Sequence, residues 1–184
     1  MRKTMRILSL LPATALAAAC LLSGPALFAH SETAGPTGEV VVFLVRHAEK
    51  IDAAVADDPR NPHLDDDGLH RAAELARVLG DSGVTAIHST SYHRTIETAR
   101  PLANRLGLEI KPYDPTDLRS FAGALRSSAG RHLVVGHSNT TPQLVELLGG
   151  EPGAPIVEAD EYDRLYVLVI RGDETTSTIL RFGE

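Results

Sequence analysis

The sequence contains a single cysteine, Cys20, which lies in an apolar N-terminal stretch. One cysteine excludes a disulfide framework and a thiolate metal cluster, and its position excludes a catalytic cysteine in the folded part of the chain. Tryptophan is absent, and aromatic residues make up only 4% of the 184 residues. Aromatic platforms that stack nucleic-acid bases or sugar rings are therefore not expected.

Positive charge is also scarce beyond the N-terminus. The first 29 residues contain Arg2, Lys3 and Arg6 and no acidic residue, which leaves 15 basic against 24 acidic side chains in the rest, a net charge of −9. So acidic a chain is a poor match for nucleic acid or an anionic membrane surface. A local cluster of basic residues in it is expected to serve a specific purpose.

Residues 1–29 have the pattern of an export signal, with a basic start and an uncharged, Ala/Leu-rich run from Ile7 to Ala29. Two processing routes are open. The sequence LAAAC resembles a bacterial lipobox, which would attach a lipid and hence a membrane anchor to Cys20, whereas cleavage near Ala29 would release the protein. An uncleaved anchor is a third reading, since 23 residues just span a bilayer. Each route predicts an exported protein, in the periplasm or associated with the cell envelope.

After the signal, residues 30–38 are interpreted as a linker and residues 39–184 as one domain. Strands are expected at 40–45, 84–88, 108–111, 132–135, 165–170 and 176–182, and helices at 69–79, 92–106, 117–127 and from Thr140 to just before Gly149. This alternation predicts an α/β fold, a three-layer α/β/α sandwich with a largely parallel central sheet. Ligands of such sheets bind beyond the carboxyl ends of the strands.

Two arginines and two histidines follow directly after three of these strands. Arg46 and His47 come after the first strand, Arg94 opens the helix after the second, and His137 comes after the fourth. Guanidinium groups hold phosphate oxygens through paired, charge-assisted hydrogen bonds, and an imidazole can attack phosphorus. This positive cluster in an acidic chain indicates a phosphate site.

The motifs in this order resemble the histidine phosphatase superfamily, which includes cofactor-dependent phosphoglycerate mutases and bacterial phosphohistidine phosphatases. The resemblance rests on Arg46-His47, on S-x4-R-T-x2-T-A at residues 89–99 and on Gly-His-Ser-Asn at residues 136–139. It implies a phosphoglycerate mutase-like fold that spans the whole domain. The chain departs from the usual Arg-His-Gly in having alanine at position 48.

The resemblance also implies roles for individual residues. His47 would be the nucleophile that becomes phosphorylated, and Arg46, Arg94 and His137 would form the phosphate pocket. Asn139 and Lys50 are further candidates for substrate binding, since they flank the two histidine motifs. Lys50 has a second interpretation as a solvated charge.

The family places a carboxylic acid some 20 to 30 residues after the second arginine, where it protonates the leaving oxygen. Asp114 lies 20 residues after Arg94 and is the first candidate. Asp117 is its rival, although we expect it to cap a helix. The acidic run at residues 65–67 is a third source, again with capping as the alternative role.

No metal or other cofactor is expected. His63, His70, His88, His93 and His132 have no spacing typical of a zinc site, and the arginines can do the work of a cation. Only 42 residues separate Arg94 from His137, which leaves little room for the segments that cover a mutase site.

The expected function is therefore metal-independent hydrolysis of a phosphorylated small molecule or phosphoprotein through a phosphohistidine. Three alternatives stay open: a phosphoglycerate mutase-type phosphotransferase, a non-catalytic module that binds phosphate or a phosphoprotein, and an exported scaffold without a ligand.

Overall fold

The computed structural model describes residues 38–183. The export signal, lipid attachment at Cys20 and cleavage near Ala29 lie outside these residues and stay predictions, as does nearly all of the linker. The described elements, in chain order, are β1 (Val40–Arg46), α1 (Asp66–Leu79), β2 (Ala86–Ser89), α2 (His93–Leu106), β3 (Ile110–Pro112), α3 (Leu118–Arg126), β4 (Gly130–Gly136), α4 (Thr140–Leu147), β5 (Arg164–Arg171) and β6 (Glu174–Arg181). None of the helices between residues 38 and 183 is long and apolar enough to cross a membrane.

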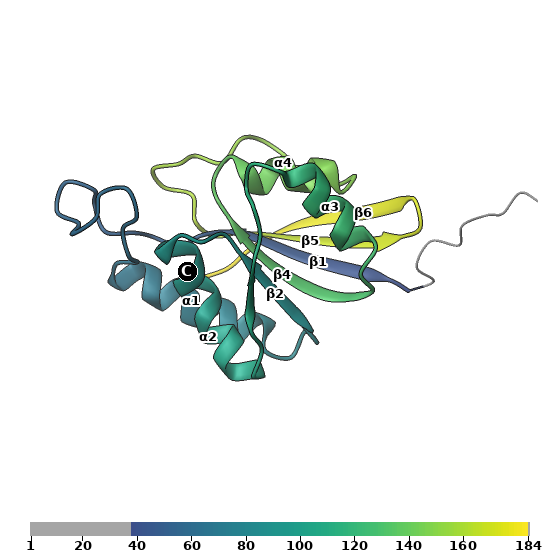
Figure 1. The fold of residues 1–184 in the computed structure, drawn as a ribbon, viewed down its shortest axis with the longest axis horizontal. Coiled ribbons are helices and arrows are strands. Elements are labelled where there is room, and N and C mark those ends of the chain that lie inside the picture. Colours follow the sequence, from purple (N-terminus) through teal and green to yellow (C-terminus); the bar gives the residue numbers. More distant parts are fainter. Residues whose placement is uncertain (1–37, 184) are drawn as a thin grey trace, which may run out of the picture. The chain divides into compact units, whose positions relative to one another are not determined.

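The six strands form one sheet in the order β3-β2-β4-β1-β5-β6 (Figure 1). The pairs β2–β3, β2–β4 and β1–β4 are parallel, whereas β5 runs antiparallel to both β1 and β6. The predicted mostly parallel sheet is therefore confirmed. The parallel strands β1, β2 and β4 end at the same edge, which brings the residues that follow them together.

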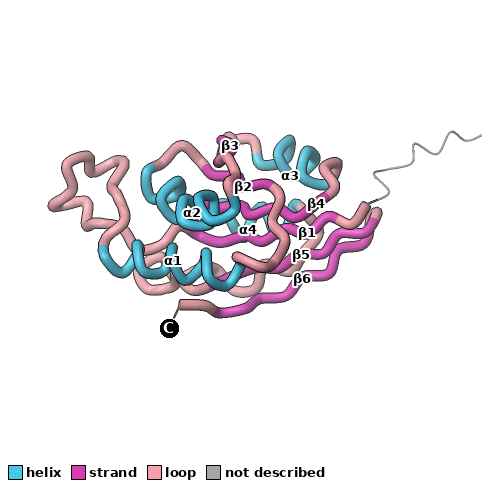
Figure 2. The backbone as a smooth tube through the Cα atoms, turned by 90° about the horizontal axis from the view of Figure 1, so that it is seen from below, coloured by secondary structure: helices cyan, strands magenta, loops and turns pink. Residues whose placement is uncertain are grey.

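Helices cover both faces of the sheet, as the tube view shows (Figure 2). In β1, Val41, Phe43 and Val45 pack with the apolar residues of α1 and α2. The alternate residues Val42 and Leu44 pack with those of α3 and α4 on the other face. Because both faces are covered, β1 is an unbroken apolar run, and the three-layer prediction is confirmed.

Two details of α2 and α4 concern how these helices continue and begin. Pro101 lies inside α2 without ending it, so residues 93–106 form one helix. The residue that precedes α4 is Asn139, and it makes no side-chain cap; Thr140 is the first helical residue. The Thr140 hydroxyl instead accepts a hydrogen bond from the backbone N–H of His137 at 3.0 Å. This bond fixes the turn between β4 and α4.

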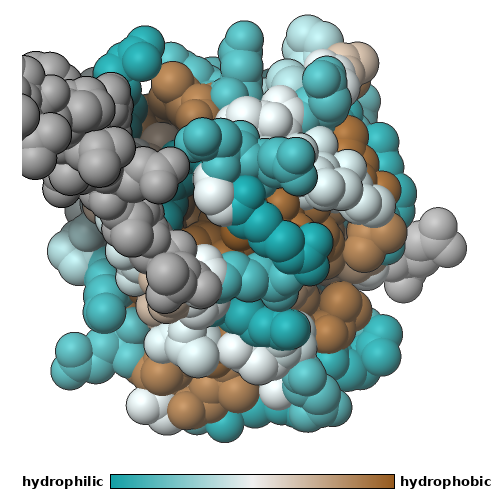
Figure 3. All heavy atoms as spheres, turned by 90° about the vertical axis from the view of Figure 1, so that its right-hand side faces the viewer, coloured by the Kyte–Doolittle hydropathy of each residue, from teal (hydrophilic) through white to brown (hydrophobic). Residues whose placement is uncertain are grey.

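The side of the molecule on which the parallel strands begin is the one that Figure 3 presents. It carries mostly hydrophilic side chains with scattered hydrophobic areas between them. The residues implicated by the sequence lie at the other ends of these strands, where β1 and β4 finish.

Candidate active site

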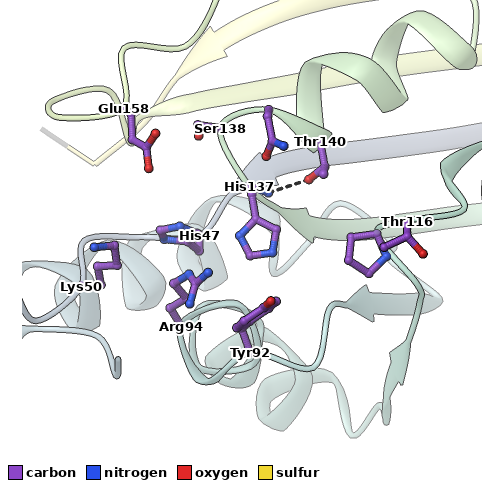
Figure 4. Close-up of a pocket in the computed structure, with 11 residues that line it drawn as sticks. His47, Lys50, Tyr92, Arg94, Thr116, His137, Ser138, Thr140 and Glu158 are labelled. Atoms are coloured by element: carbon purple, nitrogen blue, oxygen red, sulfur yellow. Dashed lines mark hydrogen bonds between the residues drawn. The ribbon is translucent and has the colours of Figure 1, made fainter. Parts of the chain in front are cut away.

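A cavity of about 580 Å³ opens beyond the carboxyl ends of β1, β2 and β4. Figure 4 shows how its side chains converge from these strand ends and from the loop before β5. The residues that line it are His47, Lys50, Tyr92, Arg94, Pro115, Thr116, His137, Ser138, Asn139, Thr140 and Glu158. Five of the residues predicted from the sequence thus surround one space: His47, Lys50, Arg94, His137 and Asn139. Arg46, the last residue of β1, directly precedes His47 in the chain.

His47 is buried at the cavity floor, with 4% of its surface exposed. Its backbone N–H donates to the carbonyl of Gly136 at 2.9 Å, and the next N–H, that of Ala48, donates to Thr98 Oγ1 at 2.9 Å. The His47 Nδ1 lies 2.8 Å from the carbonyl oxygen of Ala48. A carbonyl only accepts, so Nδ1 carries the hydrogen and Nε2 keeps its lone pair.

Both cavity histidines are held neutral. Burial lowers the pKa of His47 to about 3, and the charges of Arg46 and Arg94 add to the shift, while the hydrogen bond to Ala48 opposes it. Burial likewise lowers the pKa of His137 to about 4, followed by the effects of Arg94 and Arg46. The two rings meet edge to face with centroids 5.5 Å apart. Near neutral pH, His47 is therefore an uncharged imidazole with a free lone pair, as a nucleophile requires.

The two arginines each present a buried donor without an acceptor. Among residues 38–183, the Nε atoms of Arg46 and Arg94 are buried and make no hydrogen bond. The Arg94 guanidinium lies over the ring of Tyr92, 4.3 Å from its centroid. Burial lowers the pKa of Arg94, which Tyr92 and Glu158 oppose. Buried donors rarely stay unpaired in proteins, so this pair of N–H groups fits a bound anion.

The remaining nitrogens of Arg46 do not face the cavity, contrary to the expected two-arginine fork around phosphate. NH2 donates to the carbonyl of Glu158 at 2.7 Å and NH1 to that of Glu161 at 3.1 Å. The guanidinium also stacks on Tyr162, 3.9 Å from the ring centroid. Arg46 thus anchors the loop before β5, and its buried Nε–H stays without an acceptor in the protein.

Lys50 and Asn139, the further substrate-binding candidates, both line the cavity. Asp114 does not. Its side chain is exposed, and Oδ1 accepts from the N–H of Thr116 at 2.8 Å and from its hydroxyl at 2.7 Å. These bonds hold the pKa of Asp114 below its usual value. In this arrangement the carboxylate stabilises its own turn, and Thr116 reaches the cavity instead.

Two of the other carboxylates considered as proton donors, Asp117 and Asp65, serve as helix caps, whereas Asp66 and Asp67 lie in the first turn of α1 and do not line the cavity. Asp117 accepts from the N–H of Ser120 at the start of α3, as expected. Asp65 accepts from the N–H of Gly68, and α1 begins three residues earlier than its apolar spacing suggested. Each of these carboxylates therefore has a local structural role.

Glu158, Tyr92 and Tyr162 contribute to the site without having been identified from the sequence. Glu158 and Tyr162 belong to an irregular loop between α4 and β5 that carries no motif. Tyr92 is one of the four residues between Ser89 and Arg94 in the S-x4-R motif, and this position is the one sequence signal that pointed to it. Loop residues are found only when the fold brings them to the cavity.

The structure brings together one group of metal-ligand types within residues 38–183, His63, His93 and Glu97, whose ligand atoms lie within 4.8 Å of one another. His63 Nδ1 pairs with Glu97 Oε1 at 2.5 Å. The two imidazoles are stacked, with centroids 4.2 Å apart and planes only 14° from parallel. Ring lone pairs lie in the ring planes, so nearly parallel stacked rings do not point at one ion. The group fits a histidine–carboxylate pair that ties the loop at His63 to α2.

Comparisons with known proteins find a matching family model and solved structures with a similar fold. Residues 42–117 match the family model "Histidine phosphatase superfamily (branch 1)". No curated protein matches the chain. Solved structures with a similar fold include one from Agrobacterium tumefaciens described as a phosphohistidine phosphatase SixA (TM-score 0.60, 21% identity, covering 78% of this chain and 96% of that one). A phosphoglycerate mutase from Bacillus anthracis str. Sterne (0.57, 15%, 80% and 94%) and a protein histidine phosphatase SixA complexed with tungstate (0.59, 16%, 78% and 96%) are also similar.

Proposed function

We propose that the chain, of which residues 42–117 match the family model of the histidine phosphatase superfamily, is a metal-independent phosphatase. It hydrolyses a phosphomonoester or a phosphoprotein through a phosphohistidine on His47. The observation that carries this proposal is the state of His47: buried, neutral, with Nδ1 held by the Ala48 carbonyl and Nε2 free. A module that only bound phosphate would not need a histidine prepared in this way.

In the first step, the phosphoryl oxygens bind the Nε–H groups of Arg46 and Arg94, with His137 beside them. These donors offset negative charge as the transition state forms. The His47 lone pair then attacks phosphorus in line, and the Nδ1–H bond to Ala48 stabilises the positive charge that the ring acquires. The alcohol leaves toward the cavity mouth.

In the second step, water attacks the phosphohistidine and releases phosphate. Thr116, Asn139 and Glu158 line the cavity and are exposed to solvent, so water can reach the site, which favours hydrolysis over transfer to a retained alcohol. The short chain between Arg94 and His137 favours it for the same reason. If the export signal operates, the substrate lies in the cell envelope.

The test is phosphate release from an aryl phosphate by the purified protein in EDTA, compared with His47→Ala. We expect release that survives EDTA and is lost in the variant. His70→Ala, a change at an exposed histidine of α1, serves as the matched control and is expected to behave like the wild type. Quenching in alkali should trap a phosphorylated protein only when His47 is present.

A folded wild type that releases no phosphate from aryl phosphates or small phosphoesters, yet binds tungstate, would contradict the proposal. That result would favour the non-catalytic phosphate-binding module. Release that stops in EDTA and returns with a divalent cation would contradict the metal-independent mechanism.

A further inference from the structure

The direction of the reaction determines where a proton donor has to stand. Attack by His47 Nε2 is in line, so the leaving oxygen lies on the far side of phosphorus, toward the cavity mouth. An alkoxide is a poor leaving group, and a positioned acid that protonates it contributes about 10²–10⁴ in rate. The donor is therefore to be sought at the mouth, opposite His47.

Glu158 is the one carboxylic acid among the residues that line the cavity in the described part of the chain. Its carboxylate extends into the cavity from the loop before β5, across the opening from His47 and Arg94 (Figure 4). Burial has the largest effect on the pKa of Arg94 and lowers it, whereas the negative charge of Glu158 acts in the opposite direction. Glu158 thus lies where the leaving oxygen would emerge.

The backbone of Glu158 is held in place by the site itself. Arg46, buried behind His47, donates to the Glu158 carbonyl at 2.7 Å and to the Glu161 carbonyl at 3.1 Å. Glu161 Oε2 in turn accepts from the N–H of Val157 at 2.9 Å. Arg46 therefore holds the backbone segment that carries the Glu158 side chain.

The alternative acids are otherwise engaged. The Asp114 carboxylate is bonded twice to Thr116 and does not line the cavity. Asp117 and Asp65 cap helices α3 and α1. Glu158 has no side-chain hydrogen bond within residues 38–183 that would have to break before it could act.

We propose that Glu158 is the general acid and base of the reaction, an inference that rests on the proposed phosphatase function. In the first step the P–O bond breaks, its electron pair goes to the leaving oxygen, and the Glu158 carboxyl gives that oxygen its proton. In the second step the carboxylate takes a proton from water as the water oxygen bonds to phosphorus. The P–N bond then breaks, and its electron pair returns to His47.

The experiment compares Glu158→Gln with wild type on two substrates of different leaving-group demand. Phenyl phosphate releases a phenol with a pKa of about 10, like a tyrosine side chain, and needs protonation; 4-nitrophenyl phosphate releases a much weaker base. We expect kcat/KM to fall about 10²–10⁴-fold with phenyl phosphate, but far less with 4-nitrophenyl phosphate. Glu158→Asp should recover part of the loss.

Two controls accompany it. Glu151→Gln changes an exposed glutamate in the same loop that does not line the cavity, and it should match wild type on both substrates. Asp114→Asn tests the earlier candidate and should show no dependence on the leaving group. A leaving-group-dependent loss in Asp114→Asn, or an equal loss on both substrates in Glu158→Gln, would overturn the assignment.

Failure of the phosphatase function itself would be recognised separately. It would appear as a wild type without turnover on either substrate, or as turnover that His47→Ala leaves intact. Those outcomes reject both proposals. Wild-type turnover that depends on His47 but not on Glu158 rejects only the present one.

Discussion

Replacing Arg94 with methionine should separate ligand binding from folding. Within residues 38–183 the Arg94 guanidinium makes no hydrogen bond, and its Nε is a buried donor without an acceptor. Its burial and the charge of Arg46 oppose the attraction that it receives from Tyr92 and Glu158. Methionine has a similar length and carries no N–H group that would need an acceptor. The free energy of unfolding without ligand should therefore change by less than about 1 kcal/mol.

The effect on anion binding should be far larger. If the guanidinium makes two charge-assisted hydrogen bonds to phosphate, its removal costs about 1.5–3 kcal/mol of binding free energy for each bond, a total of about 3–6 kcal/mol. At about 1.4 kcal/mol for each factor of ten, affinity for phosphate or tungstate should fall about 10²–10⁴-fold.

The assay is urea unfolding with and without tungstate at 100 times the wild-type Kd. The wild type should gain about 2.7 kcal/mol, whereas Arg94→Met, with binding at least 100-fold weaker, should gain about 0.4 kcal/mol or less. Arg100→Met, an exposed arginine on the same helix, is the matched control and should gain as much as the wild type. A wild-type gain in Arg94→Met, or a loss of several kcal/mol without ligand, would refute this account of the site.

Three further changes test the surroundings of the nucleophile. An unfolded histidine binds a proton below pH 6.5, whereas folded His47 does so only near pH 3. The free energy of unfolding is therefore lost as the pH falls through this window, and His47 accounts for about 2 kcal/mol of the loss between pH 7 and 5. Urea unfolding of the wild type should depend more steeply on pH than that of His47→Ala, and equal slopes would contradict this prediction. Thr98→Val removes the acceptor of the buried Ala48 N–H and should cost about 1–3 kcal/mol together with activity, while Thr98→Ser should retain both; a stable, active Thr98→Val would speak against this bond. Gly68→Ala places a Cβ 2.1 Å from a backbone oxygen and should destabilise the protein by about 1–3 kcal/mol. Gly123 is an exposed helical position with nothing within 4 Å of an added Cβ, so Gly123→Ala should stabilise the protein by about 0.5–1 kcal/mol. Urea unfolding that ranks the two variants the other way would contradict this prediction.

The sequence alone was sufficient for the architecture and for the centre of the site. The apolar run of β1, whose two faces are both covered, and the spacing of apolar residues in α1 and α2 are local patterns with one structural solution. Arg46, His47, Arg94 and His137 stand at the ends of parallel strands or a few residues beyond them, so a prediction of parallel strands was enough to bring them together. Motif order and strand direction both act over short stretches of chain.

The tertiary structure decided what stands around that centre. Asp114 has the right distance along the chain, yet its own turn claims the carboxylate through Thr116. Glu158 lies more than 100 residues from His47 in sequence, and Arg46 brings it to the cavity mouth through bonds to backbone carbonyls, which every residue type possesses. Bonds of that kind leave no mark in the amino-acid pattern. Strand ends are therefore readable from sequence, whereas the path of an irregular loop follows from long-range contacts that exist only once the chain has folded.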